Sequence, residues 1–182
     1  RDTMIFSDGA GAVVIESIES DQKSGVLSHS FVNHSNEEAF YLYFGKSNHP
    51  ESDPGIRYMK MDGRKVYEYA ISQVPAAMKA ALDKSGLEAG DVKKVLLHQA
   101  NEKMDAAIVK RFYRLFGLRP SIDEVMPMNI GELGNSSVAT IPTLYDMILK
   151  RHLGDHRIEK GDILLFASVG AGMNINAIIY KQ

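Results

Sequence analysis

Three features of the sequence predict an α/β domain built on a mixed β-sheet with helices on both faces. Short apolar stretches with strand-like patterns lie near both ends of the chain. Three longer stretches between them repeat their apolar residues at helical spacing. One short apolar stretch, residues 94–98, separates the first helix from the other two. This order of strands and helices is typical of a mixed sheet with helices packed on it.

The composition of the chain fits one soluble globular domain. Its 182 residues are 45% hydrophobic and 24% charged, which suffices for a substantial core. No apolar run approaches the roughly 20 residues that span a bilayer, and we expect no membrane association. The formal net charge of -2 gives no electrostatic footprint for nucleic acid. No basic-then-apolar signal segment opens the chain, so we expect a cytoplasmic protein.

The chain contains no cysteine, which excludes disulfides, thiolate metal sites and a cysteine nucleophile within these residues. His152 and His156 have the spacing of a metal pair, but Gly154 breaks the helix between them and no third ligand is evident. We therefore expect no metal. Because Arg1 leads directly into an apolar segment, we also expect the chain to be a piece of a longer protein.

The N-terminal third is expected to form two paired strands and a long excursion. Residues 4–6 and 12–15 predict a strand around glycines that mark the close approach of another element. Residues 25–32 predict a second strand, antiparallel to the first. Residues 33–58 predict a long loop with one short strand. Its aromatic cluster at 40–44 is expected to be buried.

The middle of the chain predicts a helix followed by a buried strand. The helix covers residues 64–85, with Asp62 as its cap and Gly86 as its stop. Pro75 lies inside this helix and is expected to kink it or to remove one hydrogen bond. Residues 94–98 then predict a short buried strand that ends at a histidine.

The C-terminal part predicts two helices and two strands. Residues 102–116 have an apolar face opposite a basic stripe. Residues 138–152 predict a helix that tolerates Pro142 in its first turn. The closing strands, 163–168 and 173–180, are joined by a glycine-containing loop.

Two polar residues and one loop are candidates for chemistry. His98 stands at the carboxyl end of a strand, where ligands gather in α/β folds, although a single histidine there is more often structural. Asn135 follows a glycine and can simply cap the helix after it. The loop 170–172 can present backbone N–H groups to an anion or form a tight hairpin turn. Each signal is weak alone.

Together with three other segments, these residues resemble the C-terminal motifs of the 3-oxoacyl-ACP synthase III family of the thiolase superfamily. The segments are SDGAGAVVIE (7–16), MDGRKVYEYA (61–70), LHQAN (97–101), GNSSVATIP (134–142) and GDILLFASVGAGM (161–173). The resemblance implies that residues 1–182 form a C-terminal thiolase-like domain. A separate N-terminal half, absent from this chain, would carry the catalytic cysteine, and the full-length enzyme would be a homodimer.

The implied activity is acyl transfer: an acyl-CoA starter is joined to malonyl-ACP with decarboxylation, which initiates fatty-acid synthesis. His98 and Asn135 match two members of a Cys-His-Asn triad. A neutral imidazole N–H and an amide N–H would stabilise the enolate oxygen, and the tautomer of His98 stays open. The backbone N–H of Ala171 matches an oxyanion donor.

The resemblance also implies substrates and a partner. The substrates are CoA and ACP-phosphopantetheine thioesters, and no cofactor is expected. The pantetheine arm is expected to contact Gly63, Tyr67 and Asn101. The acidic acyl carrier protein is expected to dock on Lys103, Lys110 and Arg111. A solvated helix face explains this basic set equally well.

Two departures from the family pattern keep alternatives open. Glu68 stands where the family often has a basic docking residue, and Val169 replaces the usual aromatic before the glycine loop. A related thiolase-fold synthase of secondary metabolism is one alternative. A non-catalytic thiolase-fold interaction domain is another, although it would have no use for both His98 and Asn135. On every reading, the chain alone is expected to be inactive.

Overall fold

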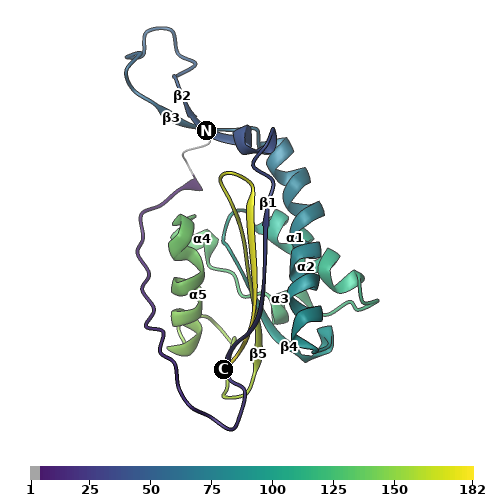
Figure 1. Cartoon of the computed structure of the whole chain (residues 1–182). Helices are drawn as coiled ribbons and strands as arrows, with labels where there is room; N and C mark the ends of the chain where they lie inside the picture. Colours follow the sequence, from purple (N-terminus) through teal and green to yellow (C-terminus); the bar gives the residue numbers. More distant parts are fainter. Residues whose placement is uncertain (1–4) are drawn as a thin grey trace.

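The computed structural model describes residues 5–182 and contains one mixed β-sheet with helices on both faces (Figure 1). The four strands lie in the order β1 (Gly25–Asn33), β6 (Asn174–Lys181), β5 (Ile163–Gly170) and β4 (Val92–Leu97). β4 and β5 are parallel, whereas β6 is antiparallel to both of its neighbours. The fold class predicted from the sequence is therefore confirmed.

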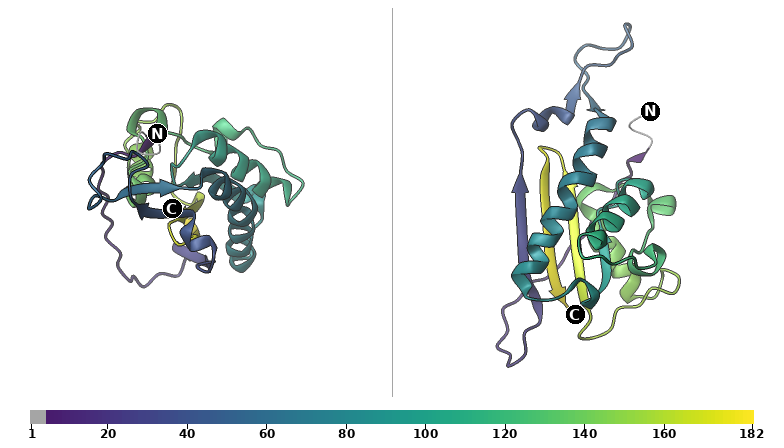
Figure 2. Two further views of the ribbon diagram at one scale, coloured as in Figure 1. Left: turned by 90° about the horizontal axis from the view of Figure 1, so that it is seen from above. Right: turned by 90° about the vertical axis from the view of Figure 1, so that its right-hand side faces the viewer.

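Three long helices cover the sheet. α1 (Gly63–Ser85) and α2 (Glu102–Arg114) lie on one face, and α5 (Thr140–Leu149) lies on the other (Figure 1). The view from above in Figure 2 separates these layers. The short helices are α3 (Ile122–Val125), α4 (Ile130–Leu133), and the 3-10 turns η2 (Glu38–Tyr41), η3 (Ala89–Asp91) and η4 (Ser137–Ala139).

The predicted ends of α1 are confirmed. The Asp62 side chain accepts a hydrogen bond from the backbone N–H of Lys65 at 3.2 Å, and Gly86 ends the helix with a φ of 74°. This left-handed conformation suits glycine, which has no Cβ to clash. The helix is continuous across Pro75. Further along, η4 precedes α5, so Pro142 is the third residue of that helix, inside the first turn as predicted.

The expected strand at the N-terminus is wrong. Residues 7–20 have no regular secondary structure, and β1 pairs with β6 instead. Met4 lies outside the described residues. The segment runs along α5 in Figure 1, because its glycines allow a close approach: a Cβ on Gly9 would lie 2.6 Å from Ser136 Cβ, and one on Gly11 would lie 2.5 Å from Pro142 Cγ. The expected close approach of another element is thus confirmed.

The excursion at 33–58 contains the one short strand expected, and a second strand that was not predicted begins at its last residue. β2 (Leu42–Gly45) pairs antiparallel with β3 (Tyr58–Met61), and this hairpin projects beyond the end of the sheet (Figures 1 and 2). The expectation that its aromatic cluster is buried is largely wrong, since Phe40 and Phe44 are 73% and 70% exposed. The hairpin leaves the sheet, so no core lies behind these rings. Tyr41 does pack against the main core.

The core is divided between the two faces of the sheet. The main cluster lies under α1 and α2 and includes Met78, Phe112 and Leu165. A small cluster under α5 consists of Leu96, Leu144 and Ile148, with partly buried neighbours. Successive residues of a strand point to opposite faces, which explains why neighbours in β4 and β5 divide between the clusters. Within residues 5–182, no helix has both the length and the apolar character needed to cross a bilayer.

Candidate active site

His98 directly follows β4 and its ring faces α5. Its backbone N–H donates to the carbonyl of Ala167 on β5 at 2.9 Å, which fixes the residue at the carboxyl end of the parallel strands. Nδ1 of the ring lies 2.7 Å from Thr140 Oγ1. Burial lowers the pKa of the imidazole, and the Ser137 backbone, which accepts from the ring, partly opposes this effect. A lowered pKa favours the neutral ring at physiological pH.

Asn135 is held by the N-terminal segment. Its backbone N–H donates to the carbonyl of Ile5 at 2.8 Å, and its carbonyl accepts from the N–H of Ser7 at 3.0 Å. The side-chain Oδ1 accepts from the N–H of Ser137 at 2.8 Å. This contact is a local side-chain turn over Ser136. Asn135 caps neither η4 nor α5, whose N-cap residues are Ser136 and Ala139. With Oδ1 occupied, the Nδ2 amino group faces elsewhere and makes no hydrogen bond within the described chain.

Ser137 and Thr140 connect the two candidate residues. The Ser137 N–H contacts Asn135, and the Ser137 carbonyl accepts from Thr140 Oγ1 at 2.9 Å. Thr140 Oγ1 in turn contacts the His98 ring. Ser137 has a φ of 56°, an uncommon conformation for a residue with a Cβ and one that is enriched at functional sites. The structure thus brings His98 and Asn135 into one polar network.

Ser137 and Thr140 lie inside the motif at 134–142, but neither residue was predicted to connect His98 with Asn135. Thr140 looks like an ordinary residue at a helix start, and no spacing relates it to His98, which lies on a strand 42 residues away. Ser137 reads as part of a polar loop. Only the strained backbone of Ser137 distinguishes it, and that strain is invisible before folding.

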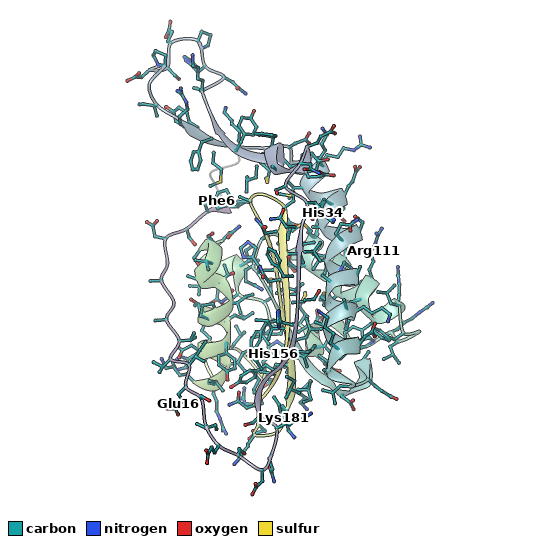
Figure 3. All side chains as sticks on the ribbon, in the orientation of Figure 1. Phe6, Glu16, His34, Arg111, His156 and Lys181 are labelled. Atoms are coloured by element: carbon teal, nitrogen blue, oxygen red, sulfur yellow. The ribbon has the colours of Figure 1, made fainter. Side chains whose placement is uncertain are left out.

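The turn between β5 and β6 lies at the same end of the sheet. Gly172 and Met173 both have positive φ, 75° and 49°, which makes the turn tight, as expected from the sequence. The Met173 carbonyl accepts from Tyr69 Oη at 3.0 Å and from the N–H of His34 at 3.2 Å. Figure 3 shows His34 at this end of the molecule and Lys181 toward the other end.

The N–H groups of the turn remain available. The Ala171 carbonyl accepts from Asn174 Nδ2 at 2.8 Å, so the turn is fixed through its carbonyl oxygens. Within residues 5–182, the N–H groups of Ala171 and Gly172 have no hydrogen-bond partner. A turn held in this way can offer preformed donors to a ligand.

The other predicted residues lie on α1 and α2. Asn101 caps α2, accepting from the N–H of Met104 at 3.1 Å. Gly63 begins α1 and Tyr67, 39% exposed, lies one turn later. Neither contacts His98 or Asn135 through any hydrogen bond among residues 5–182.

The basic residues predicted to dock a carrier protein lie on the outside of α2. Lys103, Lys110 and Arg111 are all exposed. Arg111 extends over α1, where its guanidinium donates to the Ile71 carbonyl at 3.1 Å (Figure 3). On α1, Glu68 is engaged by Arg64 in an exposed ion pair of 2.8 Å.

A buried carboxyl group under the site was not anticipated from the sequence. Asp105 of α2 is 1% exposed, and its Oδ2 is the one buried side-chain oxygen without a partner in the described residues. Burial raises its pKa to about 8, against the effect of the backbone N–H groups of Asn101 and Ala100. It borders a cavity of about 10 Å³ beside His98, which is about the size of one water molecule.

A larger hollow than the cavity beside His98 lies elsewhere. A pocket of about 410 Å³ opens beside the β2–β3 hairpin and is lined in part by Tyr41, Lys60 and Lys65. It does not include His98. No group of three metal-ligating side chains occurs in the part of the chain that the structure describes.

Comparison with known proteins identifies relatives of this domain. Residues 82–182 match the family described as 3-oxoacyl-[acyl-carrier-protein] synthase III C terminal. A β-ketoacyl-[acyl-carrier-protein] synthase III of Levilactobacillus brevis is 31% identical over 183 residues, which are 98% of this chain and 52% of the relative. The chain thus spans about half the length of the curated relatives it matches.

Solved structures agree with this assignment. A β-ketoacyl-[acyl-carrier-protein] synthase III of Thermus thermophilus superimposes with a TM-score of 0.72 and 26% identity, over 90% of this chain and 48% of that one. The corresponding enzyme of Aquifex aeolicus gives a TM-score of 0.72 at 23% identity, over 90% of this chain and 46% of that one. These neighbours share the thiolase-like α/β fold. From the matched motifs and the matched fold, the chain belongs to the 3-oxoacyl-[acyl-carrier-protein] synthase III family, in its C-terminal part.

Proposed function

We propose that residues 1–182 are the C-terminal half of an acyltransferase that joins an acyl-CoA starter to malonyl-ACP with loss of CO2, as the first step of fatty-acid synthesis in the cytoplasm. The observation that carries the proposal is the network from His98 through Thr140 and Ser137 to Asn135. It holds two side chains with free polar nitrogens at the carboxyl end of the parallel strands, where substrates bind in α/β folds.

The chemistry requires stabilisation of an enolate. Loss of CO2 from a malonyl thioester leaves negative charge on the thioester oxygen. Asn135 Nδ2 and His98 Nε2 make no hydrogen bond within residues 5–182, so both can face that oxygen. Each preorganised donor contributes about 3–4 kcal/mol to a transition state of this kind.

The nucleophile belongs to the half that is not in this chain. An acyl group on a cysteine of that half would be attacked by the enolate carbon, and the free N–H of Ala171 would receive the resulting oxyanion. Exposed apolar side chains support a covering partner: Val138, beside the site, is 89% exposed and Val14 is 97% exposed. Isolated domains rarely leave such surface uncovered. We also propose that the complete enzyme is a homodimer.

Substrate and carrier contacts complete the proposal. Gly63 and Tyr67 at the start of α1 and Asn101 at the start of α2 would line the path of the pantetheine arm. The exposed stripe of Lys103, Lys110 and Arg111 would bind the acidic acyl carrier protein, with an affinity that falls as salt rises. The substrates are thioesters, and the proposal includes no resident cofactor.

The test uses a protein that contains both halves and measures malonyl-ACP decarboxylation and condensation with acyl-CoA. His98→Ala and Asn135→Ala should each lower kcat by about 10²–10³-fold, as loss of one oxyanion donor does. His29→Ala, on the exposed side of β1, is the matched control and should behave as wild type. The chain alone should take up no acyl label from acyl-CoA. Acylation of this cysteine-free chain, or full activity of both variants, would refute the proposal.

A further inference from the structure

The backbone of Met173, at the end of the turn between β5 and β6, has an unfavourable conformation. Its φ is 49°, in the left-handed region that residues with a Cβ seldom adopt. Gly172 before it also has a positive φ, 75°, and these two left-handed residues close the turn that begins at Ala171. If Met173 relaxed to an ordinary φ, the chain before it would change direction. The position of the Ala171 N–H therefore depends on the contacts that hold Met173.

Two donors hold the Met173 carbonyl. The N–H of His34, which follows β1, donates to it at 3.2 Å, and the Tyr69 hydroxyl of α1 donates to it at 3.0 Å. Tyr69 is 8% exposed and Met173 is 1% exposed, so water cannot easily replace the hydroxyl. Loss of the hydroxyl would leave the carbonyl with one of its two hydrogen bonds, and a buried oxygen that loses a partner is destabilised.

The His34 side chain fixes the direction of the Tyr69 hydroxyl. His34 Nδ1 lies 2.7 Å from Tyr69 Oη, and the two rings meet edge to face with their centroids 5.6 Å apart. A carbonyl oxygen only accepts, so the single hydroxyl proton points to Met173, and Nδ1 supplies the proton of its own contact. Burial, with a smaller contribution from the Glu38 carboxylate, raises the pKa of Tyr69, which keeps the hydroxyl protonated at physiological pH.

A second set of contacts fixes another peptide group of the turn. Asn174 Nδ2 donates to the Ala171 carbonyl at 2.8 Å, and Asn174 Oδ1 accepts from Asn33 Nδ2. The Ala171 carbonyl and the Gly172 N–H belong to one planar peptide group, so this contact directs the Gly172 N–H. The Ala171 N–H belongs to the preceding peptide group and is fixed less directly by Asn174. Its position relies more on the contacts of Met173.

We propose that Tyr69, oriented by His34, is a positioning residue that keeps the Ala171 N–H in place as a hydrogen-bond donor. The hydroxyl acts through the Met173 backbone and touches no reacting atom. The role of Ala171 itself rests on the proposed function, in which this N–H receives the oxyanion that forms on the acyl carbonyl. An oxyanion donor is effective only at about 2.7–3.1 Å from that oxygen, so a small shift of the turn weakens it.

The proposal predicts an effect on one class of step only. The acyl carbonyl oxygen becomes charged when the cysteine takes the acyl group from acyl-CoA, and again when the enolate carbon attacks the acyl-cysteine. Loss of CO2 from malonyl-ACP places the charge on a different oxygen, the one assigned to His98 and Asn135. Tyr69 should therefore matter for acyl transfer and not for decarboxylation.

NMR relaxation on this chain tests the structural part of the proposal. In the wild type the 15N order parameter of Ala171 should be about 0.85, as for rigid backbone, and in Tyr69→Phe it should fall toward about 0.6. His34→Ala should lower it less, because the His34 backbone N–H still donates to Met173. His34→Asn keeps a donor near the Nδ1 position and should restore the wild-type value.

Tyr113→Phe is the matched control. Tyr113 is 3% exposed and also donates to a backbone carbonyl, that of Val92 at the amino end of β4. Its loss removes a buried hydroxyl without a contact to the turn, so the order parameter of Ala171 should stay at the wild-type value. An equally rigid turn in folded Tyr69→Phe, or an equally loose one in Tyr113→Phe, would overturn the proposal.

Kinetics of the two-half protein separate this proposal from the function on which it builds. Tyr69→Phe should slow single-turnover CoA release from acyl-CoA by about 10–10²-fold, since a displacement of about 1 Å can cost about 10²-fold. Decarboxylation of malonyl-ACP without acyl-CoA, in which the enolate carbon takes a proton from water, should keep its wild-type rate.

The two proposals fail in different ways. If the turn loosens in Tyr69→Phe but the wild-type two-half protein performs no acyl transfer, the positioning role in the turn stands and the proposed function fails. If the wild type is active and Tyr69→Phe transfers acyl groups at the full rate, the function stands and the role of Tyr69 is rejected. An equal loss of acyl transfer and decarboxylation would also reject it, because a general loss of structure would explain both.

Discussion

The two faces of the central sheet are covered to very different extents. Under α1 and α2 the main cluster buries side chains such as Met78 and Phe112 completely. The cluster under α5 has three members buried to that degree among the described residues, and on the β1 part of the sheet Phe31 is 60% exposed. The N-terminal segment crosses this thinly covered side without joining the sheet (Figure 1).

The well-packed face contributes most of the buried core, whereas the thinly covered face carries the side chains of the candidate site. The His98 ring lies on the thinly covered α5 side together with Thr140 and Asn135. This is the side on which we proposed that the substrate and the other half of the enzyme bind. Residues of the well-packed side contact the backbone of the site. Tyr69 of α1 donates a hydrogen bond to the Met173 carbonyl, and the Asp105 carboxyl of α2 lies next to the backbone of Ala100 and Asn101, which follow His98. Substitutions on the two sides should therefore differ in kind as well as in size.

The largest effect is expected from Asp105→Asn. Burial raises the pKa of Asp105 from 3.8 to about 8, so folding favours the protonated form. The protonated Asp105 carboxyl contributes its full stabilisation at pH values below the pKa that it has in the unfolded chain. This stabilisation is lost as the pH rises through the higher pKa that Asp105 has in the folded protein. The wild-type free energy of unfolding should therefore fall by about 1.4 kcal/mol per pH unit between about pH 4 and 8, relative to an asparagine that cannot ionise.

Urea unfolding at a series of pH values from 5 to 9 checks this dependence. Asp53→Asn, at an exposed position in the excursion, is the control and should follow the wild type at every pH. The gap between wild type and Asp105→Asn should widen with pH. Parallel curves for the two proteins would show that the carboxyl group of Asp105 does not stay protonated in the fold.

A matched pair of leucines compares the packing of the two faces. Leu165 belongs to the main cluster and Leu144 to the small one, and both are completely buried. Replacing a buried leucine by alanine costs about 2–5 kcal/mol, with the larger values where the surroundings cannot relax. We expect Leu165→Ala near the upper end of this range and Leu144→Ala near the lower end, as measured by chemical denaturation. Equal losses would mean that α5 is as rigidly packed as α1 and α2.

Most of the fold was predictable because its signals are local. The signals that define α1 are its apolar periodicity, its Asp62 cap and its Gly86 stop, and each acts within a few residues. The strands β5 and β6 likewise show their apolar residues within their own sequences. The segment at 12–15 has an equally strong apolar pattern, yet it forms no strand. A strand needs a partner, and the apolar pattern of a segment does not say whether its partner lies in the same domain.

The candidate site was predictable only in part, for a similar reason. His98 and Asn135 were found through their motifs, but Thr140, Ser137 and Asp105 act through contacts between segments that are distant in sequence. The exposed position of Phe44 was missed because the sequence cannot show that the hairpin leaves the sheet. Long-range packing decides each of these cases.

The smallest expected effect concerns how the N-terminal segment covers α5, and it tests whether this thin cover matters to the site. A Cβ at Gly11 would lie 2.5 Å from the Pro142 ring, which cannot yield because it is fixed at the start of α5. The segment is exposed on its other side, so Gly11→Ala should lift it away. The free energy of unfolding should change by only about 0.5 kcal/mol, while hydrogen exchange and proteolysis of residues 7–20 should accelerate.

Because this segment continues from the backbone that pairs with Asn135, the Asn135 side-chain amide signals should shift as well. Gly90→Ala, where an added Cβ meets nothing within 4 Å, should do neither, and equal proteolysis of the two variants would show that the contact with α5 does not hold the segment in place.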